Sequence, residues 1–417
     1  MPQTIVAIDV GTTKVCTLVA QLNQRGQLKI LGVGVAPSKG LDKGVVVSID
    51  QAASAIEASI ERAERLSGYR ISTAYVSVSG QHIASHNSHG VVAVQRPESE
   101  ITPGDVNRAI EAAQAVALPG QREILHVIPR IYSVDGHQGI RDPLGMSGTR
   151  LEVEAHIVTG EAMVVQNLIR SVQKAGVGID ELVPQPLASG EALLTPEDKE
   201  RGVMLVDIGA GTTSVAIFAQ GEVFYTGVIA VGGHHVTNDI TYILRTPQSS
   251  AEQLKLQCGS AIAGSPPEAD DPDDQLEIET LNAGEKQNAS RHMLCSIIQA
   301  RAEQLAELIY QEFQRSNYAG MLPAGIVLTG GGAQLARLDE LIYAMLGLPV
   351  RIGMPTALTG LTDALNSPAY SASVGLLHWS LRSERLLNQG YHLSEEHQTR
   401  GTTLERVKGW LSIFLPR

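Results

Sequence analysis

Two stretches repeat one pattern about two hundred residues apart: IVAIDVGTTKVCTLVA at 5–20 and MLVDIGAGTTSVAIFA at 204–219. Each is an apolar, β-branched run that leads into Asp-x-Gly, then a Thr-Thr pair, then a second apolar run. The pattern predicts a β-hairpin with a tight Gly-Thr turn, present twice. Because the copies are so far apart, we expect a duplicated α/β lobe.

Further elements can be placed around the two hairpins. Residues 50–68 show the apolar spacing of an amphipathic helix, with Ser48 or Asp50 as its start signal and Gly68 just past its end. TAYVSVSG (73–80) is typical of a strand. The segment 85–160 breaks the pattern with many Gly, Pro and turn residues, which predicts an inserted subdomain. AGIVLTGGGAQL (324–335) predicts a buried strand, a glycine turn and a helix start.

Composition narrows the class of protein. The chain has 417 residues, 43% of them hydrophobic and 18% charged, as in a globular protein with two or more lobes. Its net charge of -12 opposes binding to phosphate backbones, so we expect no nucleic-acid partner. Three widely spaced cysteines favour a reducing compartment. No apolar run reaches the roughly 20 residues of a membrane span. We therefore expect a cytoplasmic protein.

The two turns have the chemistry of a phosphate site. A glycine turn lets backbone N–H groups approach phosphate oxygens, because no Cβ stands in the way. Threonine hydroxyls and a lysine add further donors. The predicted donors of the first turn are Gly11, Thr12, Thr13 and Lys14, and those of the second are Gly209, Gly211, Thr212 and Thr213.

An aspartate precedes each turn at the same offset. Asp9 and Asp207 could hold Mg²⁺ through water, since that ion keeps most of its hydration shell. A single Gly-Thr turn would be explained equally well as a plain hairpin. Two copies, each with its aspartate, together with a downstream Gly-Gly-Gly, favour a polyphosphate clamp. No Walker A sequence is present, so the chain is not a P-loop NTPase.

These motifs carry a family resemblance. DVGTTK, LASGEALL, DIGAGTTSVAIF, VLTGGGAQL and YSASVGLLHW resemble the five nucleotide-site motifs of the actin, Hsp70 and sugar-kinase superfamily. LDKGVV, REILHVIPR, DPLGMSGTRLEVE and RIGMP…LTGLTD resemble the bacterial cell-division family FtsA. The resemblance covers essentially the whole chain. It implies an actin-like ATPase fold: an α/β chain with two duplicated ribonuclease H-like lobes, inserted subdomains and a C-terminal amphipathic helix.

The resemblance also implies a division of the chain. The expected parts are 1–84 with 161–195 (subdomain 1A), 85–160 (inserted subdomain 1C, of the SHS2 type), 196–230 with 301–382 (subdomain 2A), 231–300 (subdomain 2B), 383–403 (linker) and 404–417 (amphipathic membrane-targeting helix).

By the same resemblance, further residues are expected around ATP and Mg²⁺. Gly232, Gly233 and Asn238 would border the ribose, and Glu252 and Lys255 would flank the sugar and base. Gly330, Gly331 and Gly332 would let the adenine lie against backbone. Gln185 aligns with the water-positioning residue of actin and Hsp70, although a plain loop residue fits its position equally. Ser214 stands where the family often has an acidic residue, which implies slow hydrolysis or none.

The last residues have a character of their own. In TLERVKGWLSIFLPR an apolar stripe follows helical spacing, and a polar segment precedes it. An apolar helix on a polar tether suits insertion in the plane of a membrane interface, as in FtsA. A helix docked on the protein's own body is the alternative. The predicted membrane-facing side chains are Leu404, Val407, Trp410, Leu411 and Phe414.

The resemblance implies an ATP-binding adaptor rather than an enzyme. Such a protein would tether FtsZ filaments to the cytoplasmic face of the inner membrane at the division site. Its implied partners are the FtsZ C-terminal tail at about 231–300, membrane lipid, further copies of itself in filaments, and later divisome proteins through subdomain 1C. An ATP-dependent kinase of the superfamily and a PilM-like pilus-assembly protein remain alternatives.

Overall fold

The computed structural model describes residues 4–23, 27–94, 100–115, 118, 120–265, 274–282, 285–356 and 358–388. Its first sheet has six strands in the order β11-β6-β1-β2-β3-β19. Their bounds are β1 (Thr4–Val10), β2 (Lys14–Leu22), β3 (Leu28–Pro37), β6 (Thr73–Val78), β11 (Gly178–Pro184) and β19 (Leu358–Gly360). The predicted first hairpin is confirmed, since β1 and β2 pair antiparallel around residues 11–13.

A second sheet repeats the first. Its five strands run in the order β14-β13-β12-β17-β18, which matches β3-β2-β1-β6-β11 strand for strand. They are β12 (Val203–Ile208), β13 (Thr213–Ala219), β14 (Glu222–Ile229), β17 (Ile326–Thr329) and β18 (Val350–Ile352). In both sheets the first three strands are antiparallel and the next two are parallel. The predicted duplication is therefore confirmed.

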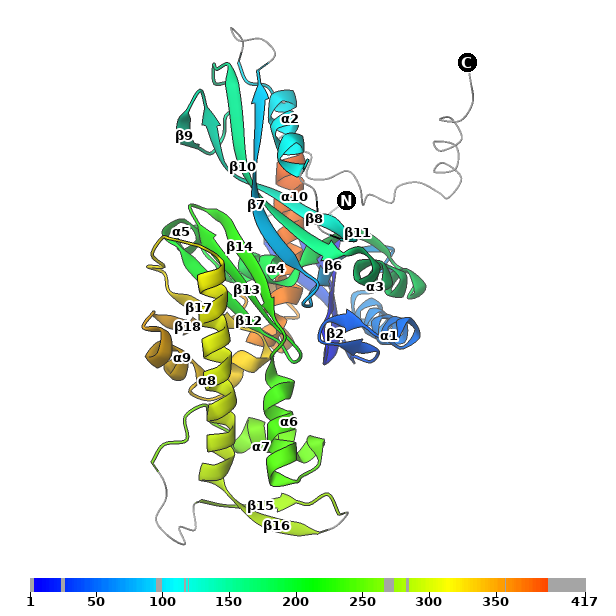
Figure 1. The fold of residues 1–417 in the computed structure, drawn as a ribbon. Helices are drawn as coiled ribbons and strands as arrows, with labels where there is room; N and C mark the ends of the chain where they lie inside the picture. The colour runs from blue at the N-terminus through cyan, green and yellow to red at the C-terminus, as the bar shows by residue number, and fades with distance from the viewer. Residues whose placement is uncertain are drawn as a thin grey trace.

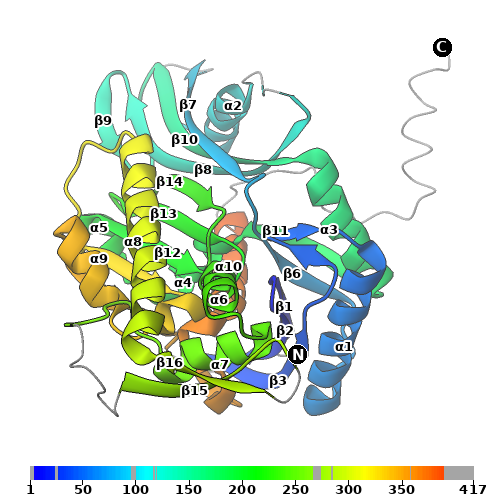
Figure 2. The same cartoon turned by 60° about the horizontal axis from the view of Figure 1, so that its bottom comes forward.

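Helices cover both sheets (Figures 1 and 2). The predicted helix after β3 is α1 (Ile49–Ser67), which Ser48 caps at its start and the left-handed Gly68 ends. Its buried residues Ile56, Ile60 and Ala63 lie in the core of the first lobe. The other helices of the two lobes are α3 (Ala162–Lys174), α4 (Gln185–Leu193), α5 (Pro196–Arg201), α6 (Gly233–Leu244), α7 (Gln248–Cys258), α8 (Arg291–Arg315), α9 (Leu338–Leu346) and α10 (Ser371–Asn388).

The strands of the second sheet are buried on both faces. Val203 and Leu205 of β12 lie in one hydrophobic cluster with Leu187 and Leu377 of α4 and α10. The alternate residues Met204 and Val206 pack into another cluster, beneath α8 and α9. This period of two explains why the strand reads as a continuous apolar run.

Helices α4 and α10 cross in very close contact. A Cβ on Gly375 of α10 would lie 1.9 Å from the carbonyl oxygen of Ala188 in α4. A side chain at residue 375 would therefore force the helices apart. The crossing holds Ser189 and Ser373 at the centre of the molecule, beneath the two lobes.

The end of the described chain corrects two boundaries. Residues 358–382 were expected with the second lobe, but β19 pairs in parallel with β3 of the first sheet. Helix α10 packs on β1, β2 and β6 of the first sheet and on α4, and its residues Val374, Leu376 and Trp379 are buried there. The linker was expected to begin at residue 383, but α10 continues to Asn388.

Two further pieces extend from the lobes (Figure 1). Residues 84–161 form a four-stranded antiparallel sheet, β7-β10-β8-β9, with one helix against it. Its elements are β7 (Ala84–Ala93), α2 (Pro103–Gln114), β8 (Arg122–Val134), β9 (His137–Ile140) and β10 (Arg150–Glu161). At the opposite end, β15 (Gln275–Glu279) and β16 (Lys286–Ser290) form a hairpin beside α6, α7 and α8. A small ribbon, β4 (Leu41–Asp42) and β5 (Val45–Val46), lies before α1.

The four-stranded sheet is joined to β14 of the second lobe by buried polar contacts. Ser85 Oγ donates to the Thr226 carbonyl at 2.7 Å. The His156 ring lies 2.7 Å from Asn87 Oδ1 through Nδ1 and 3.2 Å from Thr226 Oγ1 through Nε2. Since Asn87 Oδ1 can only accept, Nδ1 carries the proton and Nε2 accepts. Burial, with the nearby charge of Arg130, lowers the pKa of His156 to about 3.

This histidine predicts acid sensitivity. The pKa of His156 in the folded protein lies below the ordinary 6.5. Its contribution to the free energy of unfolding is therefore fully present above pH 6.5 and is lost as the pH falls toward 3. Between pH 7.5 and 5.0 the loss is about 2 kcal/mol. His156→Gln should remove that part of the pH dependence of the unfolding free energy, measured by urea titration. His137→Gln, at an exposed position in β9, is the control. An unchanged pH dependence in His156→Gln would contradict the assignment.

Candidate functional site

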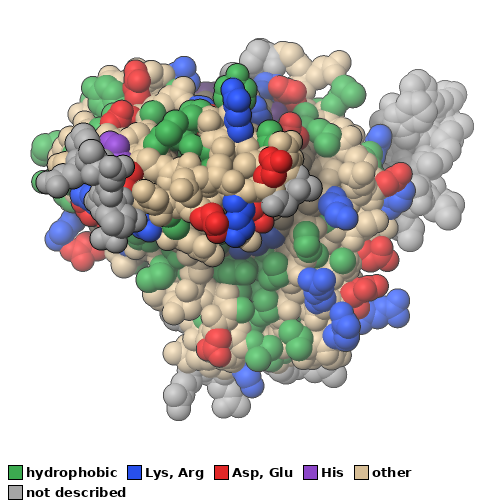
Figure 3. Space-filling model, turned by 90° about the horizontal axis from the view of Figure 1, so that it is seen from below, with side chains coloured by type: hydrophobic (Ala, Val, Ile, Leu, Met, Phe, Trp, Pro, Cys, Tyr) green, Lys and Arg blue, Asp and Glu red, His purple; other side chains and the backbone are tan. Residues whose placement is uncertain are grey.

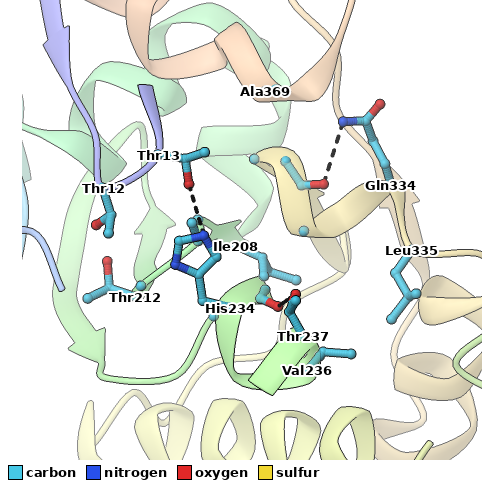
Figure 4. Close-up of a pocket in the computed structure, with 18 of the residues that line it drawn as sticks. Thr12, Thr13, Ile208, Thr212, His234, Val236, Thr237, Gln334, Leu335 and Ala369 are labelled. Atoms are coloured by element: carbon cyan, nitrogen blue, oxygen red, sulfur yellow. Dashed lines mark hydrogen bonds between the residues drawn. The ribbon is translucent and has the colours of Figure 1, made fainter. Parts of the chain in front are cut away.

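A cavity of about 700 Å³ lies between the two lobes, where the two hairpin turns face each other (Figure 4). Both turns close with the same backbone hydrogen bond: Gly11 N donates to Lys14 O at 3.0 Å, and Gly209 N donates to Thr212 O at 2.9 Å. A Cβ on Gly211 would lie 3.0 Å from Thr12 Oγ1, so the second turn packs directly on the first. The repeat seen in the sequence thus becomes a two-sided cradle.

Two buried carboxylates lie behind the turns. Asp9 accepts hydrogen bonds from Ser77 Oγ at 2.7 Å and from Ser373 Oγ at 2.9 Å. Asp207 accepts from Ser189 Oγ at 2.6 Å. Burial, reinforced by the charge of Asp9, raises the pKa of Asp207 to about 6, although the Ser189 bond opposes the shift. The site therefore concentrates negative charge at its floor.

The Lys14 side chain lies near these carboxylates. The Lys14 ammonium stands 3.3 Å from the centre of the Tyr370 ring. Burial lowers the pKa of Lys14, while the charge of Asp9 acts in the opposite direction. Its amino group is thus placed beside the first turn, where an anion entering the cradle would meet it.

The aspartate pair fits a hydrated divalent cation. The charge of Asp9 disfavours the charge of Asp207, and a bound cation would offset that effect. Mg²⁺ is usually held through one or two carboxylates and water rather than by a full protein cage. Among the residues that the structure describes, no group of three His, Cys, Asp or Glu side chains is placed to hold a metal directly.

The start of α6 closes the next part of the cavity. Gly232 and Gly233 line it. Gly233 N donates to Gly209 O at 2.9 Å, which ties the helix to the second turn. A Cβ on Gly232 would lie 2.6 Å from the carbonyl oxygens of Gly209 and Ala210, so this contact requires glycine.

The other wall comes from α7. Glu252 and Lys255 both line the cavity, joined at 2.7 Å. Lys255 Nζ also donates to Thr237 Oγ1 at 2.9 Å and to the Gly233 carbonyl at 3.3 Å. The lysine and the glutamate are therefore held in place before any ligand arrives.

The glycine run expected under a base lies at the far end. Gly330, Gly331 and Gly332 line the cavity, and the 3-10 turn η2 (Gly331–Gln334) follows β17. Gly330 has φ +82° and ψ 169°, a conformation essentially limited to glycine. A Cβ there would lie 2.4 Å from Asp207 Oδ1. The turn thus packs against the carboxylate floor.

Most of the predicted residues gather at this cavity, but two do not line it. Thr213 is buried, and its hydroxyl donates to Val231 O at 2.8 Å. Asn238 is exposed on α6 and accepts from Gln248 Nε2 at 3.4 Å. The lining members of the predicted set are Asp9, Gly11, Thr12, Thr13, Lys14, Gln185, Asp207, Gly209, Gly211, Thr212, Gly232, Gly233, Glu252, Lys255, Gly330, Gly331 and Gly332.

Two residues bear on hydrolysis. Gln185, the first residue of α4, lines the cavity, and its side chain acts against the rise in the pKa of Asp207. Ser214 pairs with Asp207 across the hairpin, but it is not among the lining residues. Its hydroxyl is buried without a hydrogen-bond partner in the described structure. The side chain at position 214, where the family often has a carboxylate, therefore does not face the cavity.

Several lining residues were not predicted from the sequence. His234, Gln334, Leu335 and Ala369 all line the cavity. His234 directly follows the predicted Gly232-Gly233 pair, and Gln334 lies just after the glycine run. Their position next to predicted residues is the feature of the sequence that could have indicated them.

The predicted membrane-facing residues at 404–417 lie outside the described residues, as does the linker beyond Asn388. No helix in the described part of the chain is long and apolar enough to cross a membrane.

Comparison with known sequences gives a consistent result along the chain. Residues 204–375 match the family described as "Cell division protein FtsA", and residues 80–159 match the "SHS2 domain inserted in FTSA". The chain is 39% identical to the cell division protein FtsA of Pseudomonas aeruginosa, covering 98% of this chain and 97% of that one. With FtsA of Escherichia coli K12 the identity is 34%, over 98% and 97%.

Solved structures show the fold. The PilM-PilN type IV pilus biogenesis complex contains a chain with a TM-score of 0.64 at 15% identity, covering 92% of this chain and 99% of that one. MreB5 of Spiroplasma citri bound to AMPPNP gives 0.55 at 15% identity, over 93% and 99%. The predicted actin-like fold is confirmed by these neighbours.

The glycine turn at the base end allows a paired test. Gly330→Ala should lower the unfolding free energy by about 1–3 kcal/mol, since alanine rarely adopts this backbone conformation and its Cβ would meet Asp207. Gly331→Ala is the matched control, because its Cβ would meet only Ala369, at 3.9 Å. Urea unfolding measures both. Equal stability of the two variants would show that the conformation of Gly330 is not required.

Proposed function

The chain belongs to the FtsA family of cell division proteins, and on that premise we propose that it is an ATP-dependent adaptor. It binds ATP and Mg²⁺ between its lobes and tethers FtsZ filaments to the cytoplasmic face of the inner membrane at the division site. The observation that carries the proposal is the pair of facing turns, each backed by a buried aspartate, in a chain that aligns with FtsA over nearly its whole length.

The lining residues suggest how the nucleotide is held. The turns at residues 11–13 and 209–212 surround the phosphates from both sides, with Lys14 as a cationic donor. Asp9 and Asp207 hold Mg²⁺ through water, and the ion neutralises phosphate charge when bound. Glu252 and Lys255 flank the sugar, and the glycine turn at 330–332 supports the base. A nucleotide thus bridges the lobes, since its parts contact both.

The same geometry favours an adaptor over an enzyme. Hydrolysis needs a residue that orients or deprotonates water within reach of the terminal phosphate. Ser214 is buried and does not line the cavity. Gln185 lines it, but an amide cannot take a proton from water. We therefore propose that the bound nucleotide controls assembly and that its hydrolysis is slow.

The partners are proposed on the family resemblance. The FtsZ tail binds at residues 231–300, where α6 exposes Tyr242 and Ile243. Figure 3 views this end of the molecule and shows hydrophobic side chains among charged ones. The four-stranded sheet at 84–161 serves later divisome proteins, and copies of the chain form filaments. The helix at 404–417 binds lipid, and polymerisation strengthens that attachment because many helices act together.

If the cavity binds nucleotide, removing a phosphate contact should lower the affinity for MgATP measurably. Lys14→Ala should weaken MgATP binding by about tenfold or more, because a charge-assisted contact to phosphate is removed. Isothermal calorimetry with and without Mg²⁺ measures the affinity. Lys29→Ala in β3, at a residue that does not line the cavity, is the control. Unchanged affinity in Lys14→Ala would exclude the site as drawn.

The same preparation distinguishes an adaptor from an enzyme. Phosphate release should stay far below the roughly 10 s⁻¹ of a typical enzyme. Release near that rate from the purified chain would contradict the adaptor proposal while leaving ATP binding intact.

If the chain tethers filaments to a membrane, its binding to lipid should depend on its last residues. Deleting 404–417 should abolish co-sedimentation of the protein, and of FtsZ filaments, with liposomes while MgATP affinity stays unchanged. Trp410→Glu should have a similar effect, because it places a charge on the apolar stripe. Added salt should matter little, since few cationic residues lie in this segment. Full co-sedimentation by the truncated chain would instead favour a tail that docks on the body.

A further inference from the structure

One histidine bridges the mouth of the cavity. His234 Nε2 lies 3.4 Å from Thr13 Oγ1, so the start of α6 in the second lobe reaches the turn of the first lobe. Figure 4 shows its ring directed at Thr13, with Thr12 and Thr212 nearby. The imidazole thus lies between the two turns that form the proposed phosphate cradle.

The ring is attached to a firm support. His234 N donates to Ala210 O at 2.9 Å, one residue after the bond from Gly233 N to Gly209 O. The second turn and the first turn of α6 are therefore joined through the backbone. Thr13, in contrast, belongs to the first lobe and is exposed. A phosphate entering the cradle can displace the Thr13 contact without moving the histidine's own backbone.

The charges around the ring suit an anion. Lys14 of the first turn and Lys255 of α7 line the same cavity as the ring. Lys255 Nζ lies 3.6 Å from the Cβ position of Gly233, the residue before His234. Glu252 of α7, already paired with Lys255, interacts with the ring through its charge, and His235 is the next residue of α6. Arg301, Asp9 and Asp207 also line the cavity. A phosphate bound between the turns would accept a hydrogen bond from an imidazole N–H, and a stronger one from an imidazolium, the form that histidine takes at lower pH.

We propose that His234 determines the preference for a nucleoside triphosphate over a diphosphate, by donating a hydrogen bond to the terminal phosphate in place of its contact with Thr13. The inference rests on the proposed nucleotide binding and extends it to one residue. A diphosphate ends one phosphate earlier and leaves the ring with its threonine partner. The discrimination therefore comes from one charge-assisted bond that only the longer ligand can make.

The experiment compares MgATP and MgADP affinities by calorimetry at pH 6.0 and 8.0. For the natural chain, the ratio of the two affinities should be about tenfold larger at pH 6.0, the scale of one charge-assisted hydrogen bond. His234→Gln should lower the ratio at pH 6.0 by about tenfold and so remove the tenfold difference between the two pH values. Asp207, whose pKa is about 6, titrates in every variant alike, so the comparison between variants isolates the histidine. His137→Gln, on β9, should behave as the natural chain does.

A second variant keeps the test decisive if glutamine disturbs α6. His234→Lys places a permanent cation at the position and should give a high ratio at both pH values. If both variants show the natural pH dependence, or if lysine and glutamine give the same ratio, the role of His234 is overturned while nucleotide binding stands. If the natural chain binds neither nucleotide, the proposed function fails, and the inference fails with it.

Discussion

The structure is organised around two carboxylates that are buried between its lobes. Asp9 and Asp207 are 8% and 2% exposed, and each stands behind a glycine turn. Buried charge is tolerated only where hydrogen bonds or a counter-charge compensate for lost water. Serines supply those bonds: Ser77 and Ser373 to Asp9, and Ser189 to Asp207. The helices that carry Ser189 and Ser373 must therefore meet at the centre, and glycine at residue 375 is what permits it.

Duplication explains the resemblance of the lobes, and chain path explains their difference. The two sheets have the same strand order and direction, and each turn is closed by the equivalent backbone hydrogen bond. The first sheet alone gains a strand from the end of the described chain, β19, which lies beside β3. The last helix then returns to the first core. Each lobe thus contributes one turn and one aspartate, while α4 and α10 connect them from below.

Local patterns in the sequence predicted what local physics decides. The hairpins, α1 with its Ser48 and Gly68 ends, and the strand before the glycine run all follow from periodicity and capping. Contacts between distant residues were beyond that reasoning. Ser373 and Asp9 are 364 positions apart, and nothing near residue 358 signals its pairing with residue 28.

Side-chain direction was the other gap. Thr213 and Asn238 have the right chemistry and the right neighbours, yet one is buried behind the turn and the other is exposed on α6. Conversely, His234 shows no feature in sequence that distinguishes it from His235 beside it. Which of two adjacent residues faces a cavity depends on where the helix is anchored, and here that anchor is the second turn.

Helix α10 also has a mechanical position. Near its start, Ser371 Oγ lies 2.7 Å from Thr329 Oγ1, and Ser373 holds Asp9. Three turns later, Arg382 is paired with Glu191 at 2.7 Å and Glu222 at 2.6 Å, on α4 and β14. A force on the C-terminal end of α10 would therefore meet the ion pairs of Arg382 before it reached Ser373 and the carboxylate that this serine holds. The helix is thus a rigid link from that end of the fold to the floor of the cavity.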